Sequence, residues 1–412
     1  MRSMPQASAR RHSHPPARSI GSSTAGAGGN EGRRGIIGRI ASAEHPMDRR
    51  QWLRSAPLVA AVPAAPLLAG CGARDRYEAE AAALWRHASP SPDAVPADAR
   101  LRELVRYATL AANSHNTQPW RFERRADGLL LRPDATRRTP VVDPDDHHLW
   151  ASLGCATENL VLAAAATGLH AEPAVTPAGV QLALTPGRAA RSPLFEAIVD
   201  RQCTRSLYDG SAVSAADLRA LEAATVAPGL RLLLMTDRAQ VDTVAEHVAQ
   251  AAVAQMQDAR FVTELKQWVR FSDAEALATR DGLAARASAN PALPRWLGSL
   301  AFGYAVTPES ERDRYVAQIR SSSGVAVFVS ERSDVASFVA AGRAYQRFAL
   351  QATALGLKNA FINPPVEIAA LRSQFGSWLD LGGARPNFIV RFGRAAALPR
   401  SLRRPVEAVM TA

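Results

Sequence analysis

Hydrophobic residues spaced three and four apart predict a helix over residues 101–112, followed by a polar loop and a strand. The polar loop covers residues 113–118, and Pro119 follows it. Serine and asparagine favour helix ends and turns because their side chains form hydrogen bonds with nearby backbone. From Trp120 the pattern predicts a strand to residue 125. A loop at this place is either a plain turn or a binding edge, and the spacing leaves both open.

Two further Ala-rich helices are predicted at residues 148–167 and 342–355, and each ends in a Gly-Leu step. Strands are predicted between and after them, and the continuous apolar run 324–330 is typical of a sheet centre. Because helices and strands alternate in the same way twice, we predict an α+β fold of two related modules, residues 100–190 and 192–412. The other predicted strands are residues 129–132, 230–235 and 387–392.

Composition places the chain among ordinary globular proteins, with 47% hydrophobic and 21% charged residues over 412 positions. The net charge is +11, but the first 70 residues hold ten arginines and three acidic residues, a net of +7. The remainder carries about +4 (11 minus 7), which is an ordinary surface. No basic face with interleaved aromatics is visible, so a nucleic-acid partner is not expected.

The N-terminal region has three predicted parts. Residues 1–46, rich in Ser, Gly, Arg and Pro, are expected to be disordered or to precede the true start at Met47. Residues 47–71 contain Arg49-Arg50 and a short apolar run, and they resemble a twin-arginine export signal. The signal ends in Leu-Ala-Gly-Cys71, which resembles a lipoprotein cleavage box. A plain cleaved signal with an incidental cysteine is the alternative. Residues 72–99 are expected to form a linker with a short helix.

These features predict an exported, periplasmic protein that touches the membrane only through a lipidated Cys71. Twin-arginine export carries folded proteins, often with a cofactor in place, so the signal also hints at a cofactor. Without Cys71 two cysteines remain, Cys155 and Cys203, which is too few for a disulfide framework, although one bond is left open.

The polar loop carries a recognisable motif. Ser114, Asn116 and Gln118, followed by Pro119-Trp120, resemble the Ser-x-Asn-x-Gln-Pro-Trp loop of the FMN-dependent nitroreductase superfamily, in which this loop contacts the flavin. The likeness covers roughly residues 100–410 and is closest to the fused branch, in which two modules in one chain mimic the family's homodimer. It implies a monomer organised as an internal pseudo-dimer, with FMN as cofactor and a small-molecule substrate.

A second motif lies at the start of the second module. Arg201, Cys203 and Arg205 resemble the family's Arg-x-Ser-x-Arg motif, which holds the flavin phosphate, with cysteine in place of serine. Cysteine is the weaker hydrogen-bonding residue, so the substitution puts the phosphate affinity in question. The pair Arg403-Arg404 resembles the family's C-terminal basic pair, and Asn363 falls in the segment beside the flavin ring. Guanidinium groups suit phosphate because they bind its oxygens through paired, charge-assisted hydrogen bonds.

The two motifs are divided between the modules. The first module has the polar loop but no arginine motif, and the second has the arginine motif but reads Ala-Pro-Gly-Leu at the loop position. The resemblance therefore implies one complete site at the module interface and one eroded site. Ser114 and Asn116 would contact the flavin. Gln118 would do the same or only stabilise the turn, and His115 would either stack near the ring or cap the helix.

The resemblance implies an FMN oxidoreductase that reduces a nitroaromatic or quinone-like acceptor. Because the flavin carries the hydride, no catalytic side chain is expected. No metal site is expected, and His147-His148 is interpreted as a surface pair in a loop. Two alternatives remain: a flavin storage or sequestration protein without turnover, with residues 261–313 as a lid, and a non-flavin lipoprotein that keeps only the fold.

Overall fold

A five-stranded sheet in the order β11-β1-β2-β4-β3 forms the first half of the fold. In this computed structural model, residues 65–87 and 96–411 are described, and residues 63–412 group into one compact unit. Strands β1 and β2 form one antiparallel hairpin and β3 and β4 form another, and antiparallel pairing of β2 with β4 joins them. Strand β11, at the C-terminal end of the chain, pairs parallel with β1. The C-terminal end of the second predicted module therefore completes the sheet of the first. The strands are β1 (Trp120–Arg125), β2 (Gly128–Pro133), β3 (Leu169–Thr176), β4 (Gly179–Pro186) and β11 (Met410–Thr411).

A four-stranded antiparallel sheet in the order β5-β8-β10-β9 forms the second half. Every residue of β8 is buried, which confirms the prediction that residues 324–330 lie at a sheet centre. The strands are β5 (Leu230–Met235), β8 (Gly324–Ser330), β9 (Lys358–Phe361) and β10 (Arg385–Gly393).

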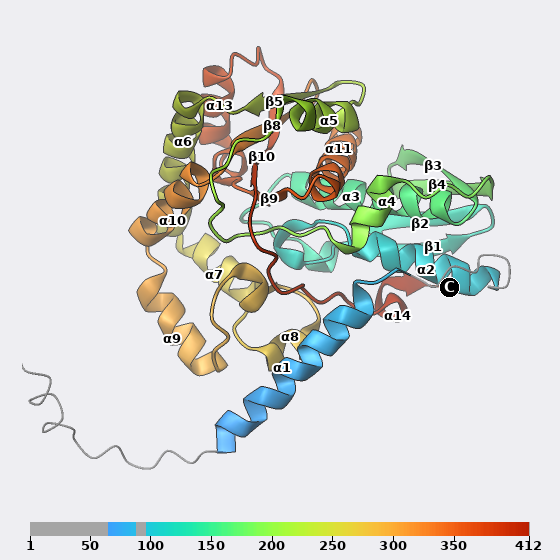
Figure 1. The fold of residues 1–412 in the computed structure, drawn as a ribbon, viewed down its shortest axis with the longest axis horizontal. Coiled ribbons are helices and arrows are strands. Elements are labelled where there is room, and N and C mark those ends of the chain that lie inside the picture. Colours follow the sequence, from blue (N-terminus) through green and yellow to red (C-terminus); the bar gives the residue numbers. More distant parts are fainter. Residues whose placement is uncertain (1–64, 88–95, 412) are drawn as a thin grey trace, which may run out of the picture. The chain divides into compact units, whose positions relative to one another are not determined.

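Two long helices, α3 (His147–Ala166) and α11 (Val335–Ala354), pack against each other between the sheets (Figure 1). A Cβ on Gly154 of α3 would lie 2.1 Å from the Val339 carbonyl oxygen, and a Cβ on Gly342 of α11 would lie 2.0 Å from the Ala151 carbonyl oxygen. Only glycine permits this approach of two backbones.

The same spacing relates both glycines to the helix ends. Gly154 and Gly342 are 188 residues apart (342 minus 154), as are Gly168 and Gly356 (356 minus 168), which follow the two helices with φ of +77° and +73°. The contacts of the helix pair are therefore reciprocal, as expected for two related modules. Helix α3 is long and apolar enough to span a bilayer, but 78% of its most apolar window is buried inside the protein.

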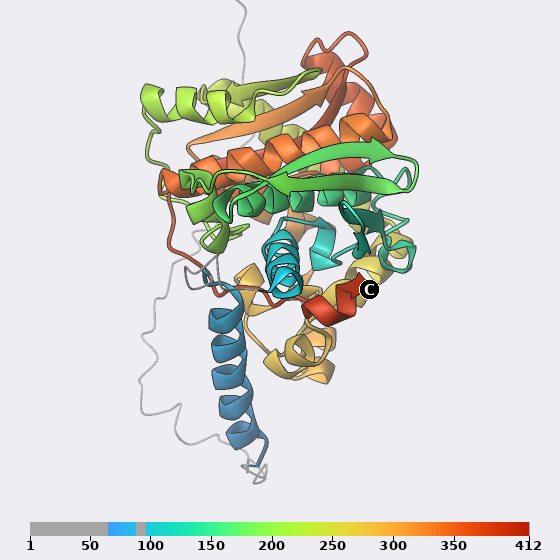
Figure 2. The same ribbon diagram turned by 90° about the vertical axis from the view of Figure 1, so that its right-hand side faces the viewer.

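The remaining elements cover these two halves, and Figure 2 shows α1 extending away from them. The predictions for residues 1–64 and 88–95 lie outside the described residues. The helices are α1 (Ala65–Leu84), α2 (Ala97–Thr109), η1 (Ser114–Asn116), η2 (Ala135–Arg137), α4 (Pro193–Glu196), η3 (Ala197–Val199), α5 (Ala215–Thr225), α6 (Arg238–Gln257), α10 (Pro308–Arg320), α12 (Pro364–Glu367), α13 (Ala369–Trp378) and α14 (Val406–Val409).

The segment that the sequence leaves irregular forms a separate layer beside the two halves (Figure 1). We call residues 259–306 the cover segment. It contains α7 (Ala259–Trp268), β6 (Val269–Arg270), α8 (Asp273–Thr279), β7 (Leu283–Ala284), η4 (Arg286–Ser288) and α9 (Arg295–Ala305).

Candidate functional site

The polar loop after α2 is conformationally strained. His115, Asn116 and Gln118 have φ of 46°, 53° and 54°, so three of the seven non-glycine residues with positive φ in the described chain lie within four positions. Such residues cost free energy and persist only where the surroundings hold them, which is common at ligand sites.

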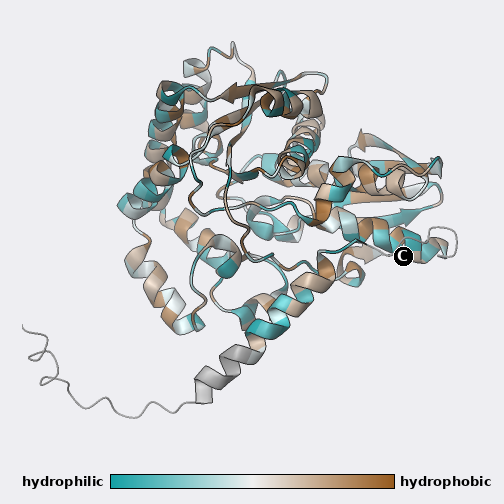
Figure 3. Ribbon diagram, in the orientation of Figure 1, coloured by the Kyte–Doolittle hydropathy of each residue, from teal (hydrophilic) through white to brown (hydrophobic). Residues whose placement is uncertain are grey.

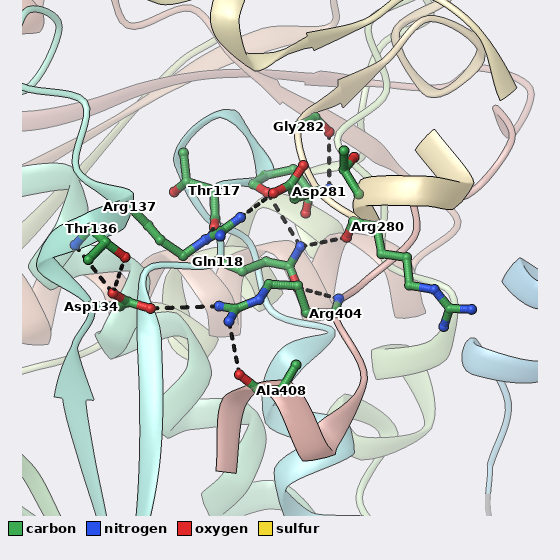
Figure 4. Close-up of polar contacts among 12 residues, drawn as sticks. Thr117, Gln118, Asp134, Thr136, Arg137, Arg280, Asp281, Gly282, Arg404 and Ala408 are labelled. Atoms are coloured by element: carbon green, nitrogen blue, oxygen red, sulfur yellow. Dashed lines mark hydrogen bonds and ion pairs between the residues drawn. The ribbon is translucent and has the colours of Figure 1, made fainter. Parts of the chain in front are cut away.

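Hydrogen bonds to the second module hold this loop in place. The Asn116 side chain donates to the Gly282 and Leu402 carbonyls, at 3.0 and 3.2 Å. The Gln118 side chain donates to the Arg280 carbonyl at 2.8 Å and accepts from the Arg404 amide at 2.7 Å (Figure 4). The side chains of Asn116 and Gln118 thus tie the loop to the cover segment and to the C-terminal tail.

A cavity of about 540 Å³ lies on the other side of the loop, between the modules and the cover segment. The first module contributes the loop and the N-terminal half of α3, and the second contributes residues from Arg205, α6, α10 to α12, β9 and β10. The cover segment contributes one apolar wall. The aromatic lining residues are Phe261, Phe271, Phe302, Tyr315, Tyr345, Phe361 and Phe388.

Two arginines line the cavity, and they differ in their partners. Arg205 forms no hydrogen bond or ion pair through its guanidinium with any described residue, while its carbonyl accepts from Gln318 at 2.6 Å. Arg314 is paired with Glu311, and its buried Nε has no partner among the described residues. Because its backbone is held and its guanidinium is unpaired among the described residues, Arg205 is the cavity cation that can bind an anionic ligand.

Arg201 and Arg403 do not line the cavity. Arg201 donates to the Leu110 carbonyl at 2.8 Å, and Arg403 donates to the Thr109 and Ala111 carbonyls at 2.7 and 3.3 Å. These carbonyls belong to the C-terminal end of α2, which carries unpaired acceptors and partial negative charge. Burial, and then the charge of Arg201, lower the pKa of Arg403 to about 9, so it remains charged at neutral pH.

Trp85, which follows α1, covers this pair of arginines. Its ring centroid lies 6.0 Å from the Arg201 guanidinium and 5.1 Å from that of Arg403, while its indole N–H donates to the Ser401 carbonyl at 2.8 Å. The face of the Trp85 ring thus makes cation–π contacts with two guanidinium groups that have no carboxylate partner among the described residues.

The remaining predicted residues divide in the same way. Asn363 lines the cavity, although its side-chain oxygen accepts from the Ile389 amide at 2.9 Å. The backbone of Cys203 forms an isolated parallel β-bridge with that of Asn359, and Cys203 does not line the cavity. Arg404 pairs with Asp134 at 3.8 Å and donates to the Ala408 carbonyl, away from the cavity (Figure 4). Cys155 and Cys203 are free thiols.

Three titratable groups lie at the floor of the cavity. Burial lowers the pKa of His115 to about 4, so its ring is neutral, and its buried Nδ1 has no partner among the described residues. His148 and Glu367 form a buried ion pair at 3.4 Å, and Gln255 donates to Glu367 at 2.6 Å. Burial alone would lower the pKa of His148, but the contact with Glu367 and the charge of Asp143 raise it.

The expectation of a surface pair at His147-His148 is wrong. The two residues begin α3 and are 1% and 6% exposed. Their donor atoms and a carboxylate oxygen of Asp143 lie within 4.8 Å of one another, so these residues could hold a metal ion. Each already has other contacts: Asp143 accepts from the His148 and Leu149 amides, and the His147 ring packs on Phe388.

Of the predicted residues, the structure brings Ser114, His115, Arg205 and Asn363 to one cavity and turns Asn116, Gln118, Arg201, Cys203, Arg403 and Arg404 away from it. Arg314, His148 and Glu367 also line the cavity and are not among the predicted site residues. The only signal for Arg314 was its spacing of three from Glu311 on one helix, which is a common surface pattern.

The chain is similar in sequence to a protein of Mycobacterium tuberculosis named "Putative NAD(P)H nitroreductase", found in strains CDC 1551 and H37Rv. The identity is 29% over 327 residues, which span 75% of this chain and 90% of the relative. No family model matches the chain.

Solved structures with a partial likeness are also nitroreductases. The FMN-bound enzyme of Bacteroides fragilis is 15% identical, covers 50% of this chain and 90% of its own, and has a TM-score of 0.32. That of Desulfitobacterium hafniense is 14% identical, covers 54% and 99%, and has a TM-score of 0.35. Scores this low add nothing about the cofactor or activity of this chain. The sequence similarity to the mycobacterial relative is what supports the nitroreductase resemblance carried by the loop and arginine motifs.

Proposed function

We propose that this protein is an FMN-binding oxidoreductase of the nitroreductase type, which reduces a nitroaromatic or quinone-like acceptor. The observation that carries the proposal is the shared cavity, which receives the strained loop from the first module and the unpaired Arg205 from the second. Its volume of about 540 Å³ is in the range of cofactor pockets.

The cavity residues fit the chemistry of FMN. The ligand has an anionic phosphate and a flat aromatic ring, and the cavity offers an unpaired guanidinium and apolar aromatic walls. We therefore assign the phosphate to Arg205, with Arg314 as a second cation when it leaves Glu311. Ser114 and Asn363 would form hydrogen bonds with the rest of the cofactor.

When bound, FMN supplies hydride transfer from a donor and to an acceptor. The contribution of the chain is position and electrostatics. The neutral His115 leaves the positive charge of the cavity to Arg205, Arg314 and His148. The cover segment excludes water through its apolar residues, which favours hydride transfer over side reactions.

We further propose that the protein is exported and held at the periplasmic face of the membrane by a lipid on Cys71. The support is the sequence of residues 47–71, with paired arginines, a short apolar run and Leu-Ala-Gly-Cys. The relatives are named for NAD(P)H, a donor that is not expected outside the cytoplasm, so the identity of the reductant is part of the proposal's test.

A storage or sequestration protein is the second candidate, because the cover segment lines the cavity along one whole wall. A bound flavin would then be enclosed and would not turn over. A non-flavin lipoprotein is the third candidate. The unpaired guanidinium of Arg205 argues against it, because an unpaired charge in a cavity costs free energy and a purely structural cavity gains nothing from it.

The test is cofactor identification followed by a redox cycle. Protein purified after native export should be yellow and should release FMN on denaturation. Addition of dithionite, NADH or NADPH should bleach the flavin absorbance, and a nitroaromatic or a quinone should restore it anaerobically. Release of no flavin would refute the FMN proposal, and a flavin that neither bleaches nor recovers would favour storage.

A further inference from the structure

We propose that helix α9 docks this protein onto a bilayer surface through Trp296, Leu300 and Tyr304. This inference rests on the proposed export and anchoring, and it is independent of whether the cavity binds FMN. It adds a second membrane contact to the lipid on Cys71.

The three side chains form an exposed apolar stripe. Trp296, Leu300 and Tyr304 are 71%, 66% and 87% exposed, and their spacing of four places them on one face of the helix. They are three of the seven large hydrophobic residues that are exposed in the described part of the chain. Isolated exposed hydrophobics are ordinary, but a stripe with a Trp and a Tyr marks an interaction surface.

The opposite face of α9 is already occupied, so the stripe is not a displaced core face. Gly298, Ala301 and Phe302 line the cavity, and a Cβ on Gly298 would lie 2.7 Å from the Phe271 side chain. The Phe302 and Phe271 rings meet edge to face at 6.2 Å. The helix therefore carries apolar residues on both faces, and Figure 3 shows brown and white residues along it. One of these faces has no partner among the described residues.

Helix α9, which carries the stripe, lies at the same end of the described structure as the N-terminal end of α1 (Figures 1 and 2). Helix α1 is fixed to the body because Tyr77 and Ala81 are buried against Ala276 and Ala284. Cys71 precedes Tyr77 by six residues, which is about 9 Å along a helix. A lipid on Cys71 would therefore hold this end of the body at the bilayer.

The residues of the stripe, and not the charge around it, suit a bilayer. Residues 282–308 contain two arginines and no acidic residue, but Arg286 pairs with Asp273 at 2.8 Å and Arg295 pairs with Glu275 at 3.0 Å. Trp and Tyr are the residues favoured at the interface between lipid and water. A second copy of the chain is a poorer occupant, because an eleven-residue helix about 16 Å long offers far less than the roughly 800 Å² per partner of a stable interface.

The experiment uses the full chain bound to vesicles of phosphatidylglycerol and phosphatidylethanolamine that contain brominated phosphatidylglycerol. Bromine quenches only tryptophans that enter the bilayer interface. The chain has seven tryptophans, so we expect quenching of the wild type to exceed that of Trp296→Phe by about one seventh of the total emission. Comparison with Trp296→Phe subtracts any signal from Trp52 in the N-terminal segment.

The variant Leu300→Ser/Tyr304→Ser should abolish this difference, whereas Val175→Ser/Val226→Ser, which removes two exposed hydrophobics elsewhere, should preserve it. Equal quenching of wild type and Trp296→Phe would overturn the proposal. So would a wild-type dimer in sedimentation that Leu300→Ser/Tyr304→Ser converts to monomer, since the stripe would then bind a second copy. Quenching at Trp296 in protein that contains no FMN would sink the proposed function and leave the docking surface standing.

Discussion

Arg201 and Arg205 are four residues apart in the sequence, but their guanidinium groups have different surroundings. Arg201 is 3% exposed, donates to a carbonyl at the end of α2 and lies over Trp85, as does Arg403. Arg205 faces the cavity with no partner for its guanidinium among the described residues. A basic motif thus contains one group committed to the fold and one group available to a ligand.

This difference shows that the role of an arginine depends on which hydrogen-bond acceptors the fold places beside its guanidinium group. The C-terminal end of a helix offers several unpaired carbonyls and a partial negative charge, so it can bind the same guanidinium that would bind a phosphate. At that helix end the cost of burying cations is offset by carbonyls and by the face of Trp85. In the cavity that compensation is missing for Arg205, and an anionic ligand would provide it.

The largest effect should come from Arg403→Met. This variant keeps roughly the volume of the side chain but removes the donors to the Thr109, Ala111 and Leu402 carbonyls, of which Ala111 and Leu402 keep Asn113 and Asn116 as donors, and it removes the cation at the end of α2. We expect a loss of about 3 kcal/mol in the free energy of unfolding. Urea unfolding followed by circular dichroism measures it, and a loss below about 0.5 kcal/mol, the size of an ordinary surface substitution, would show that Arg403 is not part of the fold's support.

The loop offers the same contrast between Gln118 and Ser114. Gln118→Ala should cost about 2 kcal/mol, because the side chain is fully buried and pairs two backbone groups. Ser114→Ala should leave stability within about 0.5 kcal/mol and weaken FMN binding several-fold. Unfolding curves and flavin titrations of both variants test this, and an equal effect of the two on stability would remove the distinction.

A smaller loss is expected for Arg201→Met, which removes one charge-assisted hydrogen bond and also relieves repulsion from Arg403. The expected cost is about 1.5 kcal/mol. The FMN content of the folded variant should stay near that of the wild type. If Arg201→Met loses FMN while its unfolding curve is unchanged, Arg201 belongs to the phosphate site and the comparison fails.

The smallest effect is a pH dependence of the cavity floor. The pKa of His148 is raised, so its contribution to stability is fully present below its unfolded value of about 6.5 and is lost as pH rises through the folded value. Burial alone would raise the pKa of Glu367, but the hydrogen bond and charge of His148 lower it, so its contribution is present above about 4.5 and is lost as pH falls. The stability difference between wild type and Glu367→Gln should therefore be largest between about pH 4.5 and 6.5.

That difference should shrink as the pH rises toward 9. Asp143, His147 and His115 also face this pair. His115 interacts with Glu367, but burial holds its pKa at about 4, below this pH range. Unfolding free energies at several pH values provide the measurement. A difference that grows above pH 7 would have the wrong sign for a His148–Glu367 ion pair.

Features set by local spacing could be predicted from the sequence. Strand β1 follows the prediction at both ends, and the helix predicted at 148–167 is observed at His147–Ala166. The second helix was predicted from residue 342 but begins at Val335, because the Asp334 side chain caps it there. No Gly or Pro marks this boundary in the sequence, so the first two turns were not predicted. The role of Gly154 and Gly342 depends on the contact between α3 and α11, which the sequence does not predict.

The candidate site was predictable only in part, because the fate of each arginine depends on distant residues. Arg201 meets Leu110, 91 positions earlier, and Arg403 meets Thr109, 294 positions earlier. No local pattern encodes these encounters. The burial of His147 and His148 was missed for a related reason: Asp146 turns the chain with φ of 55°, so the Asp-rich loop ends one residue before them and the helix carries both inward.

The central claim is that Arg205 is the anion-binding residue of a cavity shared by both modules. The most direct test is the dissociation constant of FMN for Arg205→Gln, measured by quenching of flavin fluorescence, beside Arg231→Gln, which makes the same change at an exposed position of β5. We predict that Arg205→Gln weakens FMN binding at least about tenfold, from the loss of a charge-assisted pair, with an unchanged unfolding curve. Equal FMN affinity in the two variants would contradict the account.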